Sequence, residues 1–273
     1  MIKNWVGFYT LSSREIMRFF SVWRQTIIPG IVTTLLYIFV FGVALENRIS
    51  EIGGVSYKIY ILPGLLMMNV ITNAVANSAS SMLQMKLLQT LPELLITPLS
   101  SLELSLSFII GGAIRGFVNG ILILLICWLA GMPILNLPLT LFFILLVSWS
   151  FSSLGLFVGQ LSDSWDQLAL IQNFVITPFS FLGGIFYSIK MLPGWAMTLS
   201  QVNPIYYAIS ALREATLGVS DASFLTASIF LILFTIGTTA MAVQLMSTGK
   251  KTVSYTHLRA HETRHDLVCR LLL

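Results

Sequence analysis

The stretch of residues 104–130 reads LSLSFIIGGAIRGFVNGILILLICWLA, with Arg115 as its only charged side chain. A helix needs about 20 consecutive apolar residues to cross the hydrocarbon core of a bilayer. This stretch meets that length, and it is too long for the buried helix of an ordinary soluble domain. It therefore predicts a transmembrane helix and places the chain among the all-α membrane proteins.

The composition of the whole chain supports a membrane environment. Hydrophobic residues make up 56% of the 273 residues, charged residues make up 10%, and the mean hydropathy is +0.87. Soluble domains carry about 25% charged residues, so this chain has too few to cover a soluble surface. We therefore expect the chain to lie in a lipid bilayer. The net charge of +4 is small and scattered, which argues against a nucleic-acid partner.

Apolar stretches on both sides extend the prediction to one polytopic domain, residues 1–252. We expect six transmembrane helices, at residues 27–45, 60–80, 104–130, 139–159, 167–182 and 223–246. The region 185–218 is too apolar for a free loop, yet Pro193, Gly194, Asn203 and Pro204 cut it into short pieces. Irregular backbone survives at membrane depth only inside protein or along a cavity. We therefore interpret residues 185–218 as re-entrant helices.

The segment before the first span, residues 5–24, predicts an amphipathic helix at the membrane interface. Ile16, Phe19, Phe20 and Trp23 share one face, and Arg14 and Arg18 share another. Aromatic anchors and basic residues on separate faces suit a helix lying in the headgroup plane. The alternative is a cytoplasmic helix packed on protein.

Basic residues predict that both ends of the domain face the cytoplasm, because positively charged loops are retained on that side. Under this orientation the larger basic set is inside, namely Lys3, Arg14, Arg18, Arg24, Lys86, Lys250 and Lys251, and the smaller is outside, namely Arg48, Lys58, Lys190 and Arg213. The loop 82–103 then faces the cytoplasm, and the re-entrant helices face outward.

The last segment, residues 253–273, resembles the translation of a sequencing adapter rather than native protein. We exclude it from the fold and expect natural C-terminal residues to be missing. All three histidines (His257, His261 and His265) fall in this segment, which leaves Cys127 as the only cysteine of residues 1–252. We therefore expect no metal site, no intrachain disulfide and no histidine-based catalysis in the domain.

The loop 82–103 contains a candidate docking segment. Pro92 and Pro98 bracket a short apolar stretch with one carboxylate, formed by Glu93, Leu94, Leu95, Ile96 and Thr97. Such a short exposed helix suits the groove of a partner protein. The alternative is a surface turn that lies on the membrane.

Small and polar residues follow helical faces inside several predicted spans. Gly112, Gly116 and Gly120 let another helix approach closely, either within the chain or in a second copy. Arg115 is costly at membrane depth, so it should face a partner, a cavity or the inner interface. Polar side chains also form a stripe in each of two other spans, and each stripe either makes hydrogen bonds between helices or lines a polar path. The stripe of residues 60–80 contains Asn69, Asn73 and Asn77, and that of residues 167–182 contains Gln172, Asn173, Thr177 and Ser180.

The chain lacks the parts of an energy-converting protein. No phosphate loop of the form GxxxxGK[ST] is present, so nucleotide must bind to another subunit if transport is uphill. No Asp or Glu lies securely inside a predicted span, which argues against a proton- or sodium-coupled carrier.

The ordered set of motifs resembles the permease subunits of ABC-2 type transporters, close to the YadH-like permeases of the bacterial inner membrane. The resemblance covers nearly all of residues 5–251. It rests on Ile61-Leu62-Pro63-Gly64-Leu65, on 93–98 (ELLITP), on 112–116 (GAIRG), and on a series from Thr177-Pro178 through 181–187 (FLGGIFY), Pro193 and Asn203-Pro204 to Arg213.

The resemblance implies a function and several site residues. Glu93 to Pro98 would form the coupling helix that docks on an ATPase subunit, which would bind ATP and magnesium. The gate would be the re-entrant segment with Pro178, Gly183, Gly184, Pro193, Asn203, Pro204 and Arg213. Two permeases, as a homodimer or heterodimer, and two ATPases would form an exporter. The alternatives are an ATP-independent channel or secondary carrier, a membrane-embedded enzyme and a membrane scaffold.

Overall fold

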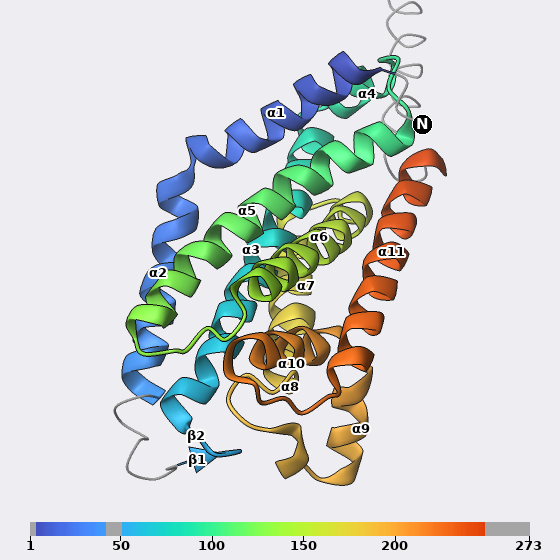
Figure 1. Ribbon diagram of the computed structural model, residues 1–273. Coiled ribbons are helices and arrows are strands. Elements are labelled where there is room, and N and C mark those ends of the chain that lie inside the picture. Colours follow the sequence, from blue (N-terminus) through green and yellow to red (C-terminus); the bar gives the residue numbers. More distant parts are fainter. Residues whose placement is uncertain (1–3, 42–50, 249–273) are drawn as a thin grey trace, which may run out of the picture.

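The computed structural model describes residues 4–41 and 51–248, and the described chain is almost entirely helical (Figure 1). Its strands β1 (Glu51–Ile52) and β2 (Val55–Ser56) form a short antiparallel hairpin. The end of the predicted helix 27–45 and the adapter-like segment 253–273 lie outside the described residues.

The helices follow the predicted order with shifted boundaries. They are α1 (Trp5–Ser21), α2 (Trp23–Phe39), α3 (Tyr57–Leu87), α4 (Leu91–Leu95), α5 (Ser101–Leu129), α6 (Leu137–Leu161), α7 (Trp165–Ile171), η2 (Gln172–Ile176), α8 (Thr177–Leu182), η3 (Ile189–Met191), α9 (Gly194–Val202), α10 (Pro204–Leu217) and α11 (Phe224–Thr248). Among the described residues, α3, α5, α6 and α11 are long and apolar enough to cross a membrane. The pair of α1 and α2, bent by 60°, would make a fifth crossing if it acts as one span. The full count of six stays a prediction.

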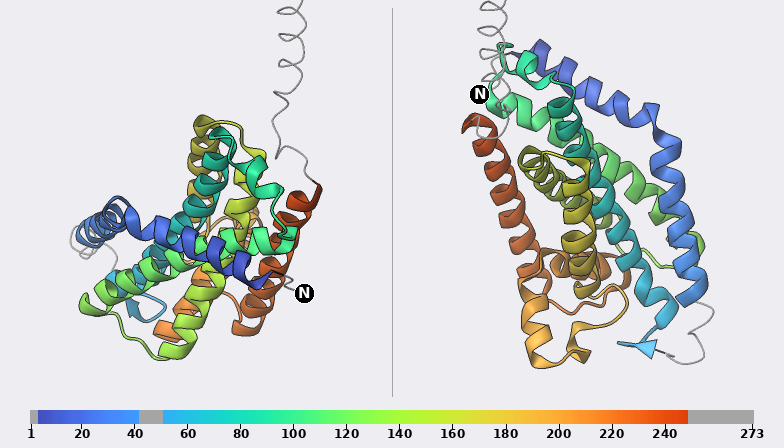
Figure 2. Two further views of the ribbon diagram at one scale, coloured as in Figure 1. Left: turned by 90° about the horizontal axis from the view of Figure 1, so that it is seen from above. Right: turned by 180° about the vertical axis from the view of Figure 1, so that it is seen from behind.

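Helix α3 forms the centre of the bundle. It packs along both α5 and α6, while α11 packs on the other side of α6 (Figures 1 and 2). Two glycines of α6 permit the close contact with α3: a Cβ at Gly155 would lie 2.5 Å from the carbonyl oxygen of Val75, and one at Gly159 would lie 2.7 Å from that of Ala79. The bundle therefore depends on small residues at its most crowded crossing.

The region predicted as the fifth span is one helical run, Trp165–Leu182, with a π-helical turn in its middle. Pro178 has no backbone N–H and crowds the preceding turn, which disfavours a regular α-helix there. The wider turn η2 precedes it, and Thr177 Oγ1 donates a hydrogen bond of 3.0 Å to the carbonyl of Gln172. Proline thus explains the irregular turn that hydropathy alone does not reveal.

The molecule has two distinct ends. The start of α1, the short helix α4 and the end of α11 gather at one end, and the β-hairpin, α8, α9 and α10 gather at the other (Figure 1). The view from behind shows the same separation (Figure 2). The start of the first described helix and the end of the last one thus lie at the same end of the molecule as α4.

The loop predicted at residues 82–103 is shorter in the structure. Helix α3 continues to Leu87, and α5 begins at Ser101. Hydropathy marks only the apolar part of a helix, whereas the backbone of α3 continues helically past Lys86. A capping box between Ser100 and Glu103 fixes the start of α5.

One ion pair at this end allows a simple stability test. Lys86 Nζ contacts Asp163 at 2.9 Å, and also donates to the carbonyls of Gln160 and Ser162 at 3.0 and 2.6 Å. Because Asp163 is exposed, we expect Asp163→Asn to lower the free energy of unfolding by no more than about 1 kcal/mol. Lys86→Met should cost more, since it leaves two carbonyls without their donor. Thermal midpoints of the purified variants measure both effects, and a larger loss in Asp163→Asn would contradict this view.

Candidate functional site

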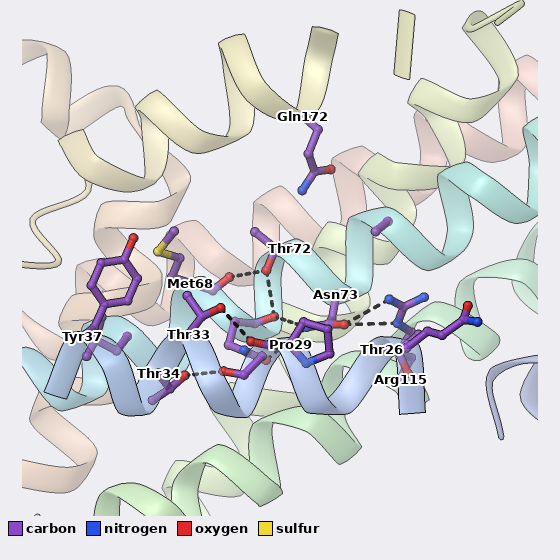
Figure 3. A pocket seen from close by; sticks show the side chains of 15 residues that line it. Thr26, Pro29, Thr33, Thr34, Tyr37, Met68, Thr72, Asn73, Arg115 and Gln172 are labelled. Carbon is purple, nitrogen blue, oxygen red and sulfur yellow. Dashed lines mark hydrogen bonds between the residues drawn. The ribbon is translucent and has the colours of Figure 1, made fainter. Parts of the chain in front are cut away.

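A polar cavity of about 310 Å³ lies between α2, α3, α5 and η2 (Figure 3). Most of its polar wall consists of hydroxyl and amide side chains, namely Gln25, Thr26, Thr33, Thr34, Asn69, Thr72, Asn73 and Gln172, together with the guanidinium group of Arg115. Helices that are apolar overall thus line a partly open, hydrogen-bonding recess.

The threonines of the cavity satisfy their own donors. Thr33 and Thr34 donate to the carbonyls of Pro29 and Gly30 at 2.6 and 2.8 Å, and Thr72 donates to the carbonyl of Met68 at 2.8 Å. Each bond runs back one helical turn, so the hydroxyls are tolerated in an apolar helix. Their oxygen lone pairs can still accept hydrogen bonds from a guest molecule.

Arg115 connects the cavity to the asparagine stripe of α3. Its Nε and Nη2 atoms donate to Asn73 Oδ1 at 3.2 and 3.1 Å, and Nη1 reaches Asn77 Oδ1 at 3.5 Å. Asn73 Nδ2 donates in turn to the backbone and side-chain oxygens of Asn69 at 3.0 and 3.1 Å. Asn69 and Asn73 therefore line the cavity, whereas Asn77 serves in contacts between helices.

Helix α1 supplies a second charged cluster behind Asn77. Arg18 Nη2 donates to the backbone and side-chain oxygens of Asn77 at 3.0 and 3.1 Å, and Arg18 also pairs with Glu15 at 3.3 Å. Glu15 is only 1% exposed, accepts a hydrogen bond from Ser81 and forms an ion pair with Arg14. A continuous polar chain thus runs from α1 through α3 to Arg115.

Helix α1 buries a face of mixed apolar and polar side chains against the bundle. Leu11, Ser12, Glu15 and Phe19 are buried, whereas Phe20 and Trp23 of the predicted aromatic face are about half exposed. The helix packs on α5, and Arg18 turns inward to Asn77. The apolar pattern correctly indicated an amphipathic helix, but a polar patch of α3 and α5 receives Glu15, which the pattern could not show.

The glycine stripe of α5 lies inside the chain. A Cβ at Gly116 would lie 2.9 Å from Ser148 Oγ and 3.0 Å from Ala74 Cβ, and one at Gly120 would lie 2.6 Å from Ile144. A Cβ at Gly112 would clash with the hydroxyls of Ser78 and Ser152. These glycines therefore bring α5 against α3 and α6 of the same chain.

The segment predicted as a re-entrant gate folds around Arg213, which is 2% exposed. Its guanidinium group donates to the carbonyls of Gly184 and Ile185 at 2.6 and 3.1 Å and to Tyr60 Oη at 3.0 Å, with Asp221 at 3.7 Å. Burial lowers the pKa of Arg213, and the nearby Tyr60 and Asp221 oppose that shift. Arg213 thus connects α10 to α3 and to the turn after α8.

The other residues of that segment shape its turns. Gly184 has a φ of +81°, which favours glycine, and Pro193 and Pro204 stand at the starts of α9 and α10. Asn203 caps α10 through the backbone N–H of Ile205 at 3.0 Å and donates to the carbonyl of Phe179 at 2.5 Å. Pro178 and Gly183 lie at the start and end of α8.

The predicted docking segment forms helix α4 at the end of the molecule that carries both described chain ends. Glu93 and Pro98 are exposed, Thr97 is half-buried, and Ile96 is 86% exposed. Leu94 and Leu95 instead pack partly against the apolar cluster around Leu91. The exposed part of the docking segment is therefore smaller than predicted, because Leu94 and Leu95 pack against the bundle.

Comparison with known proteins now identifies the family. The sequence profile described as ABC-2 type transporter matches residues 6–217. The chain belongs to this family. The permease is 35% identical over 247 residues to "Inner membrane transport permease YadH" of Escherichia coli strain K12, covering 90% of this chain and 96% of that relative. It is 25% identical over 221 residues to "Nodulation protein J" of Rhizobium leguminosarum bv. trifolii, covering 79% and 82% of the two chains.

These matches confirm the resemblance found in the sequence. The protein is an integral membrane permease of an ABC transporter, with a largely α-helical, multi-pass domain. Sequence reasoning missed Glu15, Tyr60 and Asp221, whose roles depend on distant partners, and it also missed the threonines of α2, which line the cavity. The adjacent pair Thr33-Thr34 in an apolar helix was a readable signal for a polar wall.

Proposed function

We propose that this permease is the membrane subunit of an exporter in the bacterial inner membrane, driven by ATP that a separate ATPase subunit hydrolyses. The name of the Escherichia coli relative supports this location and a transport role. The absence of a phosphate-loop motif from the sequence supports a separate nucleotide-binding partner that would also hold magnesium.

The exposed end of α4 carries this proposal. Ile96 is 86% exposed and Glu93 is also exposed where the loop leaves the bundle. A single apolar side chain beside a carboxylate suits a groove with an apolar floor and a basic rim. In this proposal the end with α4 faces the cytoplasm, both chain ends lie inside, and α9 and α10 form the outward gate.

We also propose that two copies of the permease assemble, as a homodimer, around the polar cavity. One face of α2 exposes several large apolar side chains next to that cavity, namely Ile28, Val32, Leu35, Leu36 and Phe39. Lipid or a second permease can cover this face, and a second copy would enclose the polar wall. ATP-driven movement of the α4 helices would then open and close the path between the copies.

The coupling surface predicts a loss of partner binding. We expect Ile96→Asp and Glu93→Arg to weaken association with the ATPase subunit at least tenfold, since both change exposed side chains of α4. The permease is co-expressed with the ATPase gene nearest to it in its source DNA, and co-purification in mild detergent gives the bound fraction.

A matched control separates docking from folding. Lys190→Glu reverses a charge at the opposite end and should leave association unchanged. Normal ATPase binding in Ile96→Asp and Glu93→Arg would contradict the docking role of α4. If a well-folded permease captured no ATPase at all, the alternative of an ATP-independent channel or carrier would replace the proposal.

A further inference from the structure

Positive charge exceeds negative charge around the polar cavity. Arg115 lines the cavity, and Arg18 and Arg14 stand behind it with Glu15 as the only carboxylate of this cluster among the described residues. Glu15 pairs with Arg14 and Arg18, so Arg115 has no anionic partner in the described chain. An unpaired guanidinium group at membrane depth is costly unless a counter-ion reaches it.

Hydrogen-bond donors also exceed acceptors at the same place. Arg115 uses two amide oxygens, of Asn73 and Asn77, for its five N–H groups. In the cavity wall, the side-chain N–H groups of Asn69 and Gln172 donate to no described residue, and behind the wall Asn77 Nδ2 is buried without an acceptor. Gln172 reaches toward the cavity from η2, opposite Asn73 and Arg115 (Figure 3). The cavity thus offers donors from α3, α5 and η2 at once.

We propose that this cavity binds an anionic group of the transported substrate, a phosphate or carboxylate, with Arg115 as its counter-ion. That the bound molecule is transported rests on the proposed function, whereas anion binding itself does not. The volume of about 310 Å³ suits a headgroup rather than a whole amphiphile. A cationic group is a poor fit, because no carboxylate lines the cavity among the described residues.

The test uses the full chain, purified in a neutral maltoside detergent, with dodecyl phosphate as the probe and thermophoresis as the readout. We expect Arg115→Gln to weaken binding at least tenfold, and Arg115→Lys, which keeps the charge, to weaken it less. Lys190→Gln removes an equal charge far from the cavity and should bind as the wild type does. Equal binding by Arg115→Gln and wild type would overturn the proposal.

Inorganic phosphate distinguishes two sources of the anion. If it displaces dodecyl phosphate from the wild type at millimolar concentration, the cavity accepts a free anion, and the group is recognised without a tail. If it fails while dodecyl phosphate still binds through Arg115, the anion belongs to an amphiphile. Both results support the anion site, and they distinguish a free anion from an amphiphile as the class of substrate.

A second variant keeps the proposal testable if Arg115→Gln misfolds. Gln172→Glu keeps the shape of the side chain and places a carboxylate across the cavity from Arg115. It should weaken dodecyl phosphate binding at least tenfold and raise the thermal midpoint. Gln167→Glu adds the same charge at an exposed position of α7 and should do neither. Unchanged binding in Gln172→Glu would overturn the proposal, and no ATPase is needed for any of these measurements.

Discussion

Replacing Arg213 by methionine should lower the free energy of unfolding by about 3–5 kcal/mol, the usual cost of removing one partner from a buried ion pair. The change leaves the carbonyls of Gly184 and Ile185 without their donor and leaves Asp221 without its cation. Methionine keeps much of the volume but donates no hydrogen bond. The thermal midpoint of the detergent-purified variant, followed by size-exclusion after heating, measures the loss.

Two companion variants separate the guanidinium geometry from its charge. Arg213→Lys keeps the charge but cannot reach Tyr60, Gly184 and Ile185 together, so we expect it to be nearly as unstable as Arg213→Met. Lys190→Ala, on the exposed face of the same region, should change the midpoint little. A normal midpoint for Arg213→Met would show that α10 does not depend on this contact.

The sequence predicted most of the fold because the membrane imposes simple rules on helices. The apolar runs at residues 60–80, 104–130, 139–159 and 223–246 correspond to α3, α5, α6 and α11. Their ends were misplaced by a few residues, since hydropathy follows the bilayer while hydrogen bonds and caps set the helix ends. The break at Gly183-Gly184 was predictable because adjacent glycines favour the end of a helix. In the structure Gly184 adopts a left-handed conformation there.

The interior of the site was harder to predict because it depends on contacts between distant residues. Arg115 and Asn73 lie 42 positions apart, and Arg213 and Tyr60 lie 153 positions apart. The sequence showed that Arg115 needed a partner or a cavity, and it left both open. It placed Arg213 in the re-entrant segment without naming a partner, and the structure buries Arg213 there. A periodic pattern in the sequence cannot tell which partner a buried arginine has, because that depends on how α3 packs against its neighbours.

The crossing of α3 and α6 is the second place where we expect a large effect. Gly155→Ala should lower the free energy of unfolding by about 3 kcal/mol, the upper end of the usual cost of overpacking. The added methyl group would meet the backbone of Val75, whose oxygen and Cα lie 2.5 and 2.8 Å from the ideal Cβ position. Backbone atoms cannot change rotamer, so relief requires moving α6 away from α3, which would also widen the packing around Gly112 and Gly116.

Gly237→Ala is the matched control for this substitution. Gly237 lies in helix α11, and apart from its chain neighbours and the nearby backbone of that helix no heavy atom comes within 4 Å of its Cβ position. Alanine there should be neutral or stabilising by up to about 1 kcal/mol, because it favours the helix. The same thermal assay compares the two variants, and the difference between them removes the intrinsic helix preference of alanine. If Gly155→Ala and Gly237→Ala melted at the same temperature, close backbone packing of α3 and α6 could not be what holds the bundle together.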